Sequence, residues 1–224
     1  MATANFRDQT GFFDPSKNTD TLTVIGCGGI GASSLPTLVT LGIRRIVLWD
    51  PDEVEDRNVA SQLMFRPDDV GRPKVEVAEE VLTAYGAESV EAHQEPFVSD
   101  EHGGALEGIV LSAVDTMAVR QDVWGAVNGN PFVSRLFDGR IGGETYTLID
   151  IDPLNGDHVA WYEKFQLFGD DEVVPLPCTQ RAIVYPAVVL GAQVAAAISR
   201  HQRGLPGPYF RSVDMLTGHE VVLQ

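Results

Sequence analysis

Two predicted strands near the start of the chain lead into residues that suit nucleotide binding. The first, Thr21–Ile25, runs into a glycine-rich turn, and the second, Arg45–Asp50, ends in an acid 19 residues after the last glycine of that turn. Glycines at such a turn let the backbone approach a phosphate, while the acid accepts hydrogen bonds from ribose hydroxyls. The order predicts a nucleotide-binding strand–helix–strand unit with Asp50 as the ribose ligand. The glycines of the turn are Gly26, Gly28, Gly29 and Gly31.

The glycines have separate mechanical tasks in this prediction. Gly26 lets the chain turn sharply out of the strand, Gly28 leaves room for a phosphate, and Gly31 lets the next helix pack closely on the sheet. That helix is predicted over Gly31–Leu41, and the amide groups and positive dipole at its start favour a bound anion. The alternative is a tight turn that binds no ligand.

Four more polar residues follow the second strand: Asp52, Asn58, Gln62 and Lys74. Asn58 and Gln62 lie four residues apart, so a short helix would direct both side chains toward the phosphates. The alternative for this pair is two solvated amides on a surface turn. Lys74 opens the predicted helix Lys74–Tyr85, where its charge is unfavourable unless an anion lies nearby. The alternative for Lys74 is a solvated lysine.

Asp115 stands between the predicted strand Ile109–Ala113 and the predicted helix Met117–Asn128. A carboxylate at the carboxyl end of a strand, together with nucleotide oxygens and water, suits the octahedral preference of Mg²⁺. An aspartate just before a helix is also a good N-cap. The residues by themselves leave both interpretations open.

Several of these residues fall into motifs that occur in one order. They read G-x-G-G-x-G, then W-D-P-D-x-V-x-x-x-N-x-x-x-Q, then G-R-P-K, then V-D-T-x-x-x-R. From about Phe6 to Tyr146 the chain thereby resembles the ThiF/MoeB/HesA family, the adenylating domain shared with ubiquitin-activating enzymes. The resemblance implies an enzyme, an ATP-dependent adenylyltransferase that activates the C-terminal carboxylate of a ubiquitin-like or sulfur-carrier-like protein.

The resemblance also implies site residues and cofactors. ATP and Mg²⁺ are the cofactors, Lys74 contacts the phosphates, Asp115 holds Mg²⁺, and Arg120 is structural. The implied catalytic residues are Asp115, Lys74, Arg7 and Cys178. The implied nucleotide-binding residues are Gly26, Gly28, Gly29, Gly31, Asp50, Asp52, Asn58, Gln62 and Lys74.

Arg7 and Cys178 belong to looser parts of the match. Arg7 resembles a family arginine that reaches the phosphates of the neighbouring subunit of a homodimer, and the alternative is a frayed terminus. Cys178 lies in a Cys-Thr pair that resembles the region of the catalytic cysteine, with Arg181 nearby to favour a thiolate. It is interpreted either as a thioester acceptor or as a small buried hydrophobic residue. Cys27, inside the glycine turn, is interpreted as a packing residue.

Two features depart from the family pattern, and two other functions stay open. Ser61 replaces a phosphate-contacting arginine, for which Arg57 or Arg66 would have to compensate, and the zinc-binding C-x-x-C pairs of many members are absent.

An NAD-dependent oxidoreductase would use the same glycine turn and Asp50, yet it gives no role to Lys74 or Asp115. A non-catalytic, nucleotide-binding partner of a heterodimer is the third possibility.

The composition narrows the partners and the compartment. The chain has 224 residues, 44% of them hydrophobic, and a formal charge of −16. Such a charge disfavours nucleic acid and anionic membranes as partners. We expect no membrane span, because apolar runs stay below the ~18 residues required. With two cysteines and no basic-then-apolar signal at the N-terminus, the expected location is the cytoplasm.

The elements predict an α/β fold. We expect a doubly wound, Rossmann-like, mostly parallel sheet with added antiparallel strands. Residues 1–224 are expected to form one adenylation domain, with a nucleotide-binding half at about 20–135, a C-terminal half at about 136–224 and a crossover loop at about 153–180. The remaining expected strands are Ser89–His93, Pro131–Arg135, Gly139–Asp152 and one or two within Tyr209–Leu223. A long helix is expected at Pro186–His201, and Asn155–Pro177 is expected to be loop-like.

Overall fold

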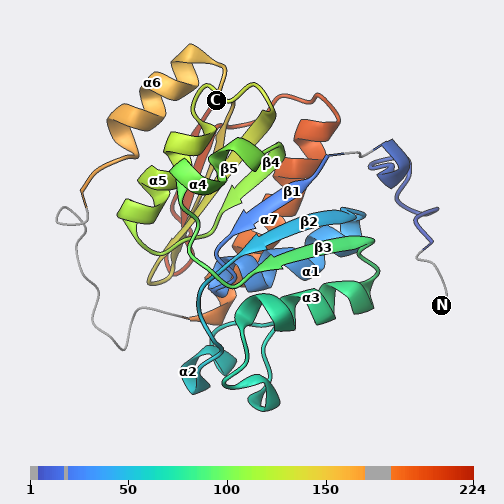
Figure 1. The fold of residues 1–224 in the computed structure, drawn as a ribbon. Helices are drawn as coiled ribbons and strands as arrows, with labels where there is room; N and C mark the ends of the chain where they lie inside the picture. Colours follow the sequence, from blue (N-terminus) through green and yellow to red (C-terminus); the bar gives the residue numbers. More distant parts are fainter. Residues whose placement is uncertain (1–4, 18–19, 170–182) are drawn as a thin grey trace.

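The computed structural model describes residues 5–17, 20–169 and 183–224, and its centre is an eight-stranded sheet (Figure 1). The strand order is β3-β2-β1-β4-β5-β6-β7-β8. Pairing is parallel from β3 to β5, with helices in the connections. The parallel strands are β1 (Leu22–Ile25), β2 (Arg45–Trp49), β3 (Ser89–His93), β4 (Gly108–Ser112) and β5 (Val133–Gly142).

The second part of the sheet is antiparallel. It consists of β6 (Thr145–Ile151), β7 (Phe210–Asp214) and β8 (Glu220–Leu223), each paired with the strand before it in the sheet. The predicted fold class, a mostly parallel doubly wound sheet with added antiparallel strands, is therefore confirmed.

Helices cover both faces of the sheet (Figure 1). One core cluster joins α1 (Gly29–Leu41), α3 (Lys74–Tyr85) and α7 (Val184–Gln202) to one face. A second cluster joins α5 (Met117–Val127) and α6 (Gly156–Phe165) to the other. All four residues of β1 are buried, as expected for a central strand covered on both sides. The shorter elements are α2 (Asp56–Val59), α4 (Ser99–His102), η1 (Pro15–Lys17), η2 (Pro67–Asp69) and η3 (Gly103–Ala105).

The prediction of a loop at about 153–180 is wrong over Gly156–Phe165. Part of the expected crossover loop at 153–180, and of the loop-like stretch Asn155–Pro177, is helix α6. Asn155 caps it, because its side-chain oxygen accepts hydrogen bonds from the N–H groups of Asp157 and His158. Tyr162 then buries its ring against the sheet. Gly156 and Asp157, two of the residues that suggested a loop, form the first turn of this helix. Residues 170–182 lie outside the described part of the chain.

A second correction concerns the predicted strands Pro131–Arg135 and Gly139–Asp152. The structure has one long strand, β5, that runs through most of the first and into the second, and a hairpin turn then separates it from β6. Gly143 makes this turn possible, since its φ of 60° lies in the left-handed region. Helix α1 also begins two residues earlier than predicted, at Gly29.

No helix in the described ranges combines the length and apolar character that a membrane crossing requires.

The packing of α7 on α1 generates a prediction about Gly191. A Cβ at Gly191 would lie 2.8 Å from the backbone of Ser33 in α1, whereas a Cβ at Gly125, also inside a helix, would lie 3.9 Å from its nearest neighbour. We expect Gly191→Ala to lower the free energy of unfolding by about 1–3 kcal/mol through overpacking. Gly125→Ala should raise it by about 0.5–1 kcal/mol through helix propensity. Urea denaturation measures both, and equal effects would contradict this account of the helix contact.

Candidate functional site

The candidate site lies at the carboxyl ends of β1 and β4. The chain leaves β1 toward β2 on one side and returns from β3 to β4 on the other, so the strand order reverses between β1 and β4. Open α/β sheets bind ligands in the crevice outside such a reversal. The loops after the two strands touch: a Cβ at Gly26, whose φ is +98°, would lie 2.6 Å from the carbonyl oxygen of Ala113. Gly26 therefore allows the two loops to meet.

Gly31 is tightly packed and Gly28 has open space around it, as predicted. A Cβ at Gly31 would lie 2.2 Å from the carbonyl oxygen of Gly26, so this position packs tightly. At Gly28 a Cβ would meet no heavy atom within 4 Å. Gly28 is the N-cap of α1 and supplies no side-chain cap to it. The N–H groups of the first turn of this 13-residue helix, which begins at Gly29, therefore suit an anion.

Asp50 lies at the end of β2 and binds the glycine turn. Its Oδ2 accepts a hydrogen bond from the N–H of Cys27 at 2.6 Å, and its Oδ1 accepts one from the N–H of Asp52 at 2.8 Å. Burial raises the pKa of the Asp50 carboxyl, against the opposing effects of the Lys74 charge and of both N–H groups. The first contact was not part of the sequence prediction. It fixes the turn, while the predicted contact with ribose stays a prediction.

Lys74 is buried, so the alternative of a solvated lysine is wrong. Its side chain is 7% exposed, and its Nζ lies 2.7 Å from Oδ2 of Asp52, whose side chain is 62% exposed. The backbone is held by the same partner, because the N–H of Lys74 donates to the carbonyl oxygen of Asp52. A buried ammonium group is thus held after the end of β2 by a carboxylate that is mostly exposed, and it also interacts with the charge of Asp50.

Asn58 and Gln62 have the predicted helical relationship. The N–H of Gln62 donates to the carbonyl oxygen of Asn58 at 2.8 Å, directly after α2. The side chain of Asn58 is buried and caps α2, with Oδ1 accepting the N–H of Glu55. Oε1 of Gln62 is buried and has no hydrogen-bond partner in the described part of the chain. Because an unsatisfied buried polar atom is costly, this oxygen fits a site that a polar ligand completes.

Asp115 is exposed, and it is not the helix cap. Thr116 caps α5, with its hydroxyl accepting the N–H of Val119 at 3.4 Å. The carboxylate of Asp115 has neither a hydrogen-bond nor an ion-pair partner among the residues described. No group of three or more His, Cys, Asp or Glu side chains in those residues could hold a metal ion. One free carboxylate does fit Mg²⁺, which takes most of its ligands from phosphates and water.

Two predicted residues are not brought to this site. Gln9 donates from its side chain to the carbonyl oxygen of Leu41 at the far end of α1, and the ring of Phe6 packs on Arg44. Arg7, between these two residues, therefore lies near the carboxyl end of α1 and not near the glycine turn at its start, with 85% of its side chain exposed. Figure 1 shows this N-terminal segment apart from the loops after β1 and β4. Within one chain Arg7 is not part of the site. Cys178 lies outside the described residues.

Cys27 behaves as a packing residue and Arg120 as a structural residue, as interpreted from the sequence. Cys27 is buried, and burial, together with the nearby charge of Asp50, raises the pKa of its thiol well above the usual range. Arg120 is buried and paired with Asp138 at 2.8 Å. The sequence analysis did not single out Asp138 or its pairing with Arg120.

The strand order, the glycine turn at the strand reversal and the acid after β2 define a doubly wound α/β protein of the Rossmann type. A family model described as the ThiF family matches residues 17–135, more than half of the chain, and the chain belongs to this family.

Named relatives are similar over about half of the chain. The sulfur carrier protein ThiS adenylyltransferase of Escherichia coli (strain K12) is 31% identical over 103 residues, which cover 45% of this chain and 41% of the relative. Ubiquitin-like modifier-activating enzyme 5 of Aedes aegypti is 31% identical over 138 residues, or 54% and 34%. SUMO-activating enzyme subunit 2 of Dictyostelium discoideum is 31% identical over 104 residues, or 45% and 16%. The matched region thus spans less than half of each relative.

Solved structures show the same fold. E. coli MccB crystallised with ATP has a TM-score of 0.72 at 19% identity, covering 94% of this chain and 65% of that one. PaaA has a TM-score of 0.72 at 17% identity, with the same coverage.

The burial of Cys27 generates a prediction about thiol reactivity. In a Cys178→Ala variant Cys27 is the remaining cysteine of the chain. Since its raised pKa disfavours the thiolate, we expect no reaction with a chromogenic disulfide reagent in the folded protein at pH 8. The same variant in denaturant should give one thiol per chain, which serves as the control. Rapid reaction of the folded protein would show that Cys27 is accessible and reactive.

Proposed function

We propose that this chain is an ATP-dependent adenylyltransferase that activates the C-terminal carboxylate of a small ubiquitin-fold or sulfur-carrier-like protein. An oxygen of that carboxylate attacks the α-phosphorus of ATP and forms a new P–O bond. The bond from that phosphorus to the bridging oxygen breaks, and pyrophosphate leaves with the electron pair. The products are an acyl-adenylate and pyrophosphate.

The observation that carries this proposal is that two opposite charges follow the two strands that flank β1 at the reversal of strand order. Lys74, a buried ammonium, follows β2, and Asp115, a carboxylate with no partner among the described residues, follows β4. A triphosphate with a divalent cation needs both. Membership of the ThiF family supports the proposal, as do relatives named for adenylation or for the activation of ubiquitin-like modifiers.

Each site residue has a role in the proposed reaction. The glycine turn, with Gly26, Gly28, Gly29 and Gly31, and the first N–H groups of α1 bind phosphate oxygens. Asp50 binds the ribose, and Asn58, Gln62 and Asp52 complete the pocket around the nucleotide. Lys74 stabilises negative charge that develops on the phosphates. Asp115 would hold Mg²⁺, which supplies further charge neutralisation when bound.

Assembly and later steps are part of the proposal. We assign residues 1–224 to one adenylation unit in the cytoplasm, acting as a homodimer in which Arg7 grips the phosphates bound by the partner chain. Cys178 is the proposed acceptor of the acyl group as a thioester. Direct transfer of the acyl-adenylate to another acceptor is the other outcome.

Ser61 favours a second candidate, a non-catalytic nucleotide-binding partner of a heterodimer. Its hydroxyl donates to the carbonyl oxygen of Arg57, so it brings no charge to the phosphates. Arg57 does not compensate, because its guanidinium pairs with Glu55 and 79% of its side chain is exposed. Pyrophosphate exchange separates the two candidates, since it requires catalysis and not binding alone.

The first prediction tests nucleotide choice. Calorimetric titration should show binding of Mg·ATP and no binding of NAD, because Lys74 and Asp115 suit a triphosphate with its cation. Lys74→Met keeps the length of the side chain. It should weaken ATP binding by about tenfold or more, because a charge-assisted hydrogen bond is lost. Lys164→Met removes an exposed lysine of α6 and is the matched control. Tight binding of NAD without binding of ATP would favour the oxidoreductase.

The second prediction tests catalysis. With a panel of recombinant small ubiquitin-fold proteins that end in glycine, the chain should exchange labelled pyrophosphate into ATP. Asp115→Asn should reduce this exchange by about 10²–10³-fold, the usual effect of removing one electrostatic group from such a site. Because Asp115 is exposed, stability should not change. Asp100→Asn, an exposed aspartate of α4, is the control. Wild-type exchange in Asp115→Asn would remove the metal role from Asp115.

A further inference from the structure

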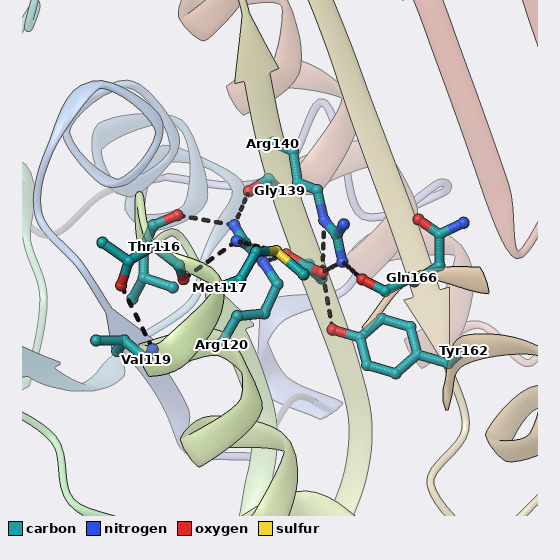
Figure 2. A network of polar contacts seen from close by, with 10 residues as sticks. Thr116, Met117, Val119, Arg120, Gly139, Arg140, Tyr162 and Gln166 are labelled. Atoms are coloured by element: carbon teal, nitrogen blue, oxygen red, sulfur yellow. Dashed lines mark hydrogen bonds and ion pairs between the residues drawn. The ribbon is translucent and has the colours of Figure 1, made fainter. Parts of the chain in front are cut away.

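A buried charge cluster lies beside the loop that carries Asp115 (Figure 2). Its centre is Asp138 on β5, which is completely buried and paired in the sheet with Ser112, the last residue of β4. Oδ1 accepts a hydrogen bond from Nε of Arg120 at 2.8 Å. Oδ2 accepts bonds from Arg140, at 2.6 Å and 3.0 Å, and from the hydroxyl of Tyr162 at 2.8 Å.

The cluster holds two positive charges against one negative charge. Burial alone would raise the pKa of Asp138, but the guanidinium groups of Arg120 and Arg140 outweigh it and keep the carboxyl ionised. Burying such groups gains little stability, because their desolvation offsets the attraction between them. Stability alone therefore does not account for a buried triad at this place.

The two arginines share a carboxylate but differ in what else they hold. Nη2 of Arg120 donates to the carbonyl oxygen of Val114 at 2.7 Å, and Nη1 lies 3.4 Å from the carbonyl oxygen of Thr116. These two residues flank Asp115 in the chain. Arg140 instead donates to the carbonyl oxygen of Gln166, after α6. Of the two arginines, only Arg120 therefore binds the carbonyl groups of the residues before and after Asp115.

We propose that Arg120 and Asp138 are positioning residues that set the direction of the Asp115 carboxylate toward a divalent cation. The inference rests on the proposed function, because it assigns that cation to Asp115. Asp138 fixes the guanidinium of Arg120, and the guanidinium fixes the backbone on both sides of Asp115. The side chain of Asp115 has no partner of its own among the described residues, so the backbone, which sets the direction of its Cα–Cβ bond, is what the protein uses to aim it.

The chemistry of the cation makes such positioning useful. Mg²⁺ demands near-ideal octahedral geometry and keeps most of its waters, so a single protein carboxylate must be held at one of the six coordination positions. Groups that hold a metal-binding residue in position typically contribute about 10–100-fold to metal affinity.

The test compares Arg120→Lys with Arg140→Lys. Lysine keeps the positive charge near Asp138, but one ammonium cannot also reach the carbonyl oxygens of Val114 and Thr116. We expect Arg120→Lys to speed hydrogen–deuterium exchange in peptides that cover 113–119 of the free protein. It should also weaken Mn²⁺ binding to the complex with AMPCPP, followed by electron paramagnetic resonance, by about tenfold. Arg140→Lys should leave both measurements at the wild-type values, although it removes an arginine from the same carboxylate.

Equal changes in the two variants would mean that the cluster only supports the fold, and no change in either would mean that the loop is held by other contacts. Both results overturn the inference. If Arg120→Lys does not fold, Tyr162→Phe decides: it removes one hydrogen bond from Asp138 at nearly constant volume. Faster exchange in 113–119 supports the inference, and wild-type exchange there overturns it. If the wild-type chain binds no nucleotide, the proposed function fails, while the exchange measurements on the free protein still test the loop contact.

Discussion

The close approach of two loops at the reversal of strand order is the constraint on which this structure depends. A Cβ at Gly26 would lie 2.6 Å from the carbonyl oxygen of Ala113, so the loops after β1 and β4 can meet only with glycine at this position. Asp50 then ties the same turn to the end of β2 through the N–H of Cys27. Three strand ends are joined in this way, and the polar residues that follow them are brought to one edge.

Much of the fold follows from local pattern. The parallel strands β1 to β4 were predicted nearly to their bounds, because buried apolar runs separated by helical spacing leave few alternatives. Helix α6 was missed because its cap and first turn, Asn155 to Asp157, have the composition of a loop. The hairpin between β5 and β6 was missed because Gly142 and Gly143, at its turn, have strand-forming residues on both sides, and the whole stretch was interpreted as one strand.

The site was predictable where a motif is contiguous, and not where partners are distant in the chain. The helical relationship of Asn58 to Gln62 followed from their spacing alone. The choice between metal ligand and helix cap for Asp115 could not be made from the sequence, since both Asp115 and its neighbour Thr116 are residue types that cap helices. The cluster around Asp138 joins residues 18 and 24 positions away, and no periodicity links them.

The ion pair between Lys74 and Asp52 is unequal in its exposure to water, 7% against 62% of the side chain. The lysine has already left most of its hydration shell on folding, whereas the aspartate keeps most of its own. In the proposed function, an anionic ligand would replace Asp52 as the counterion of Lys74, and the aspartate would return to solvent at little cost. The cost of removing water from this ammonium group would then be met when the chain folds and not when the ligand binds.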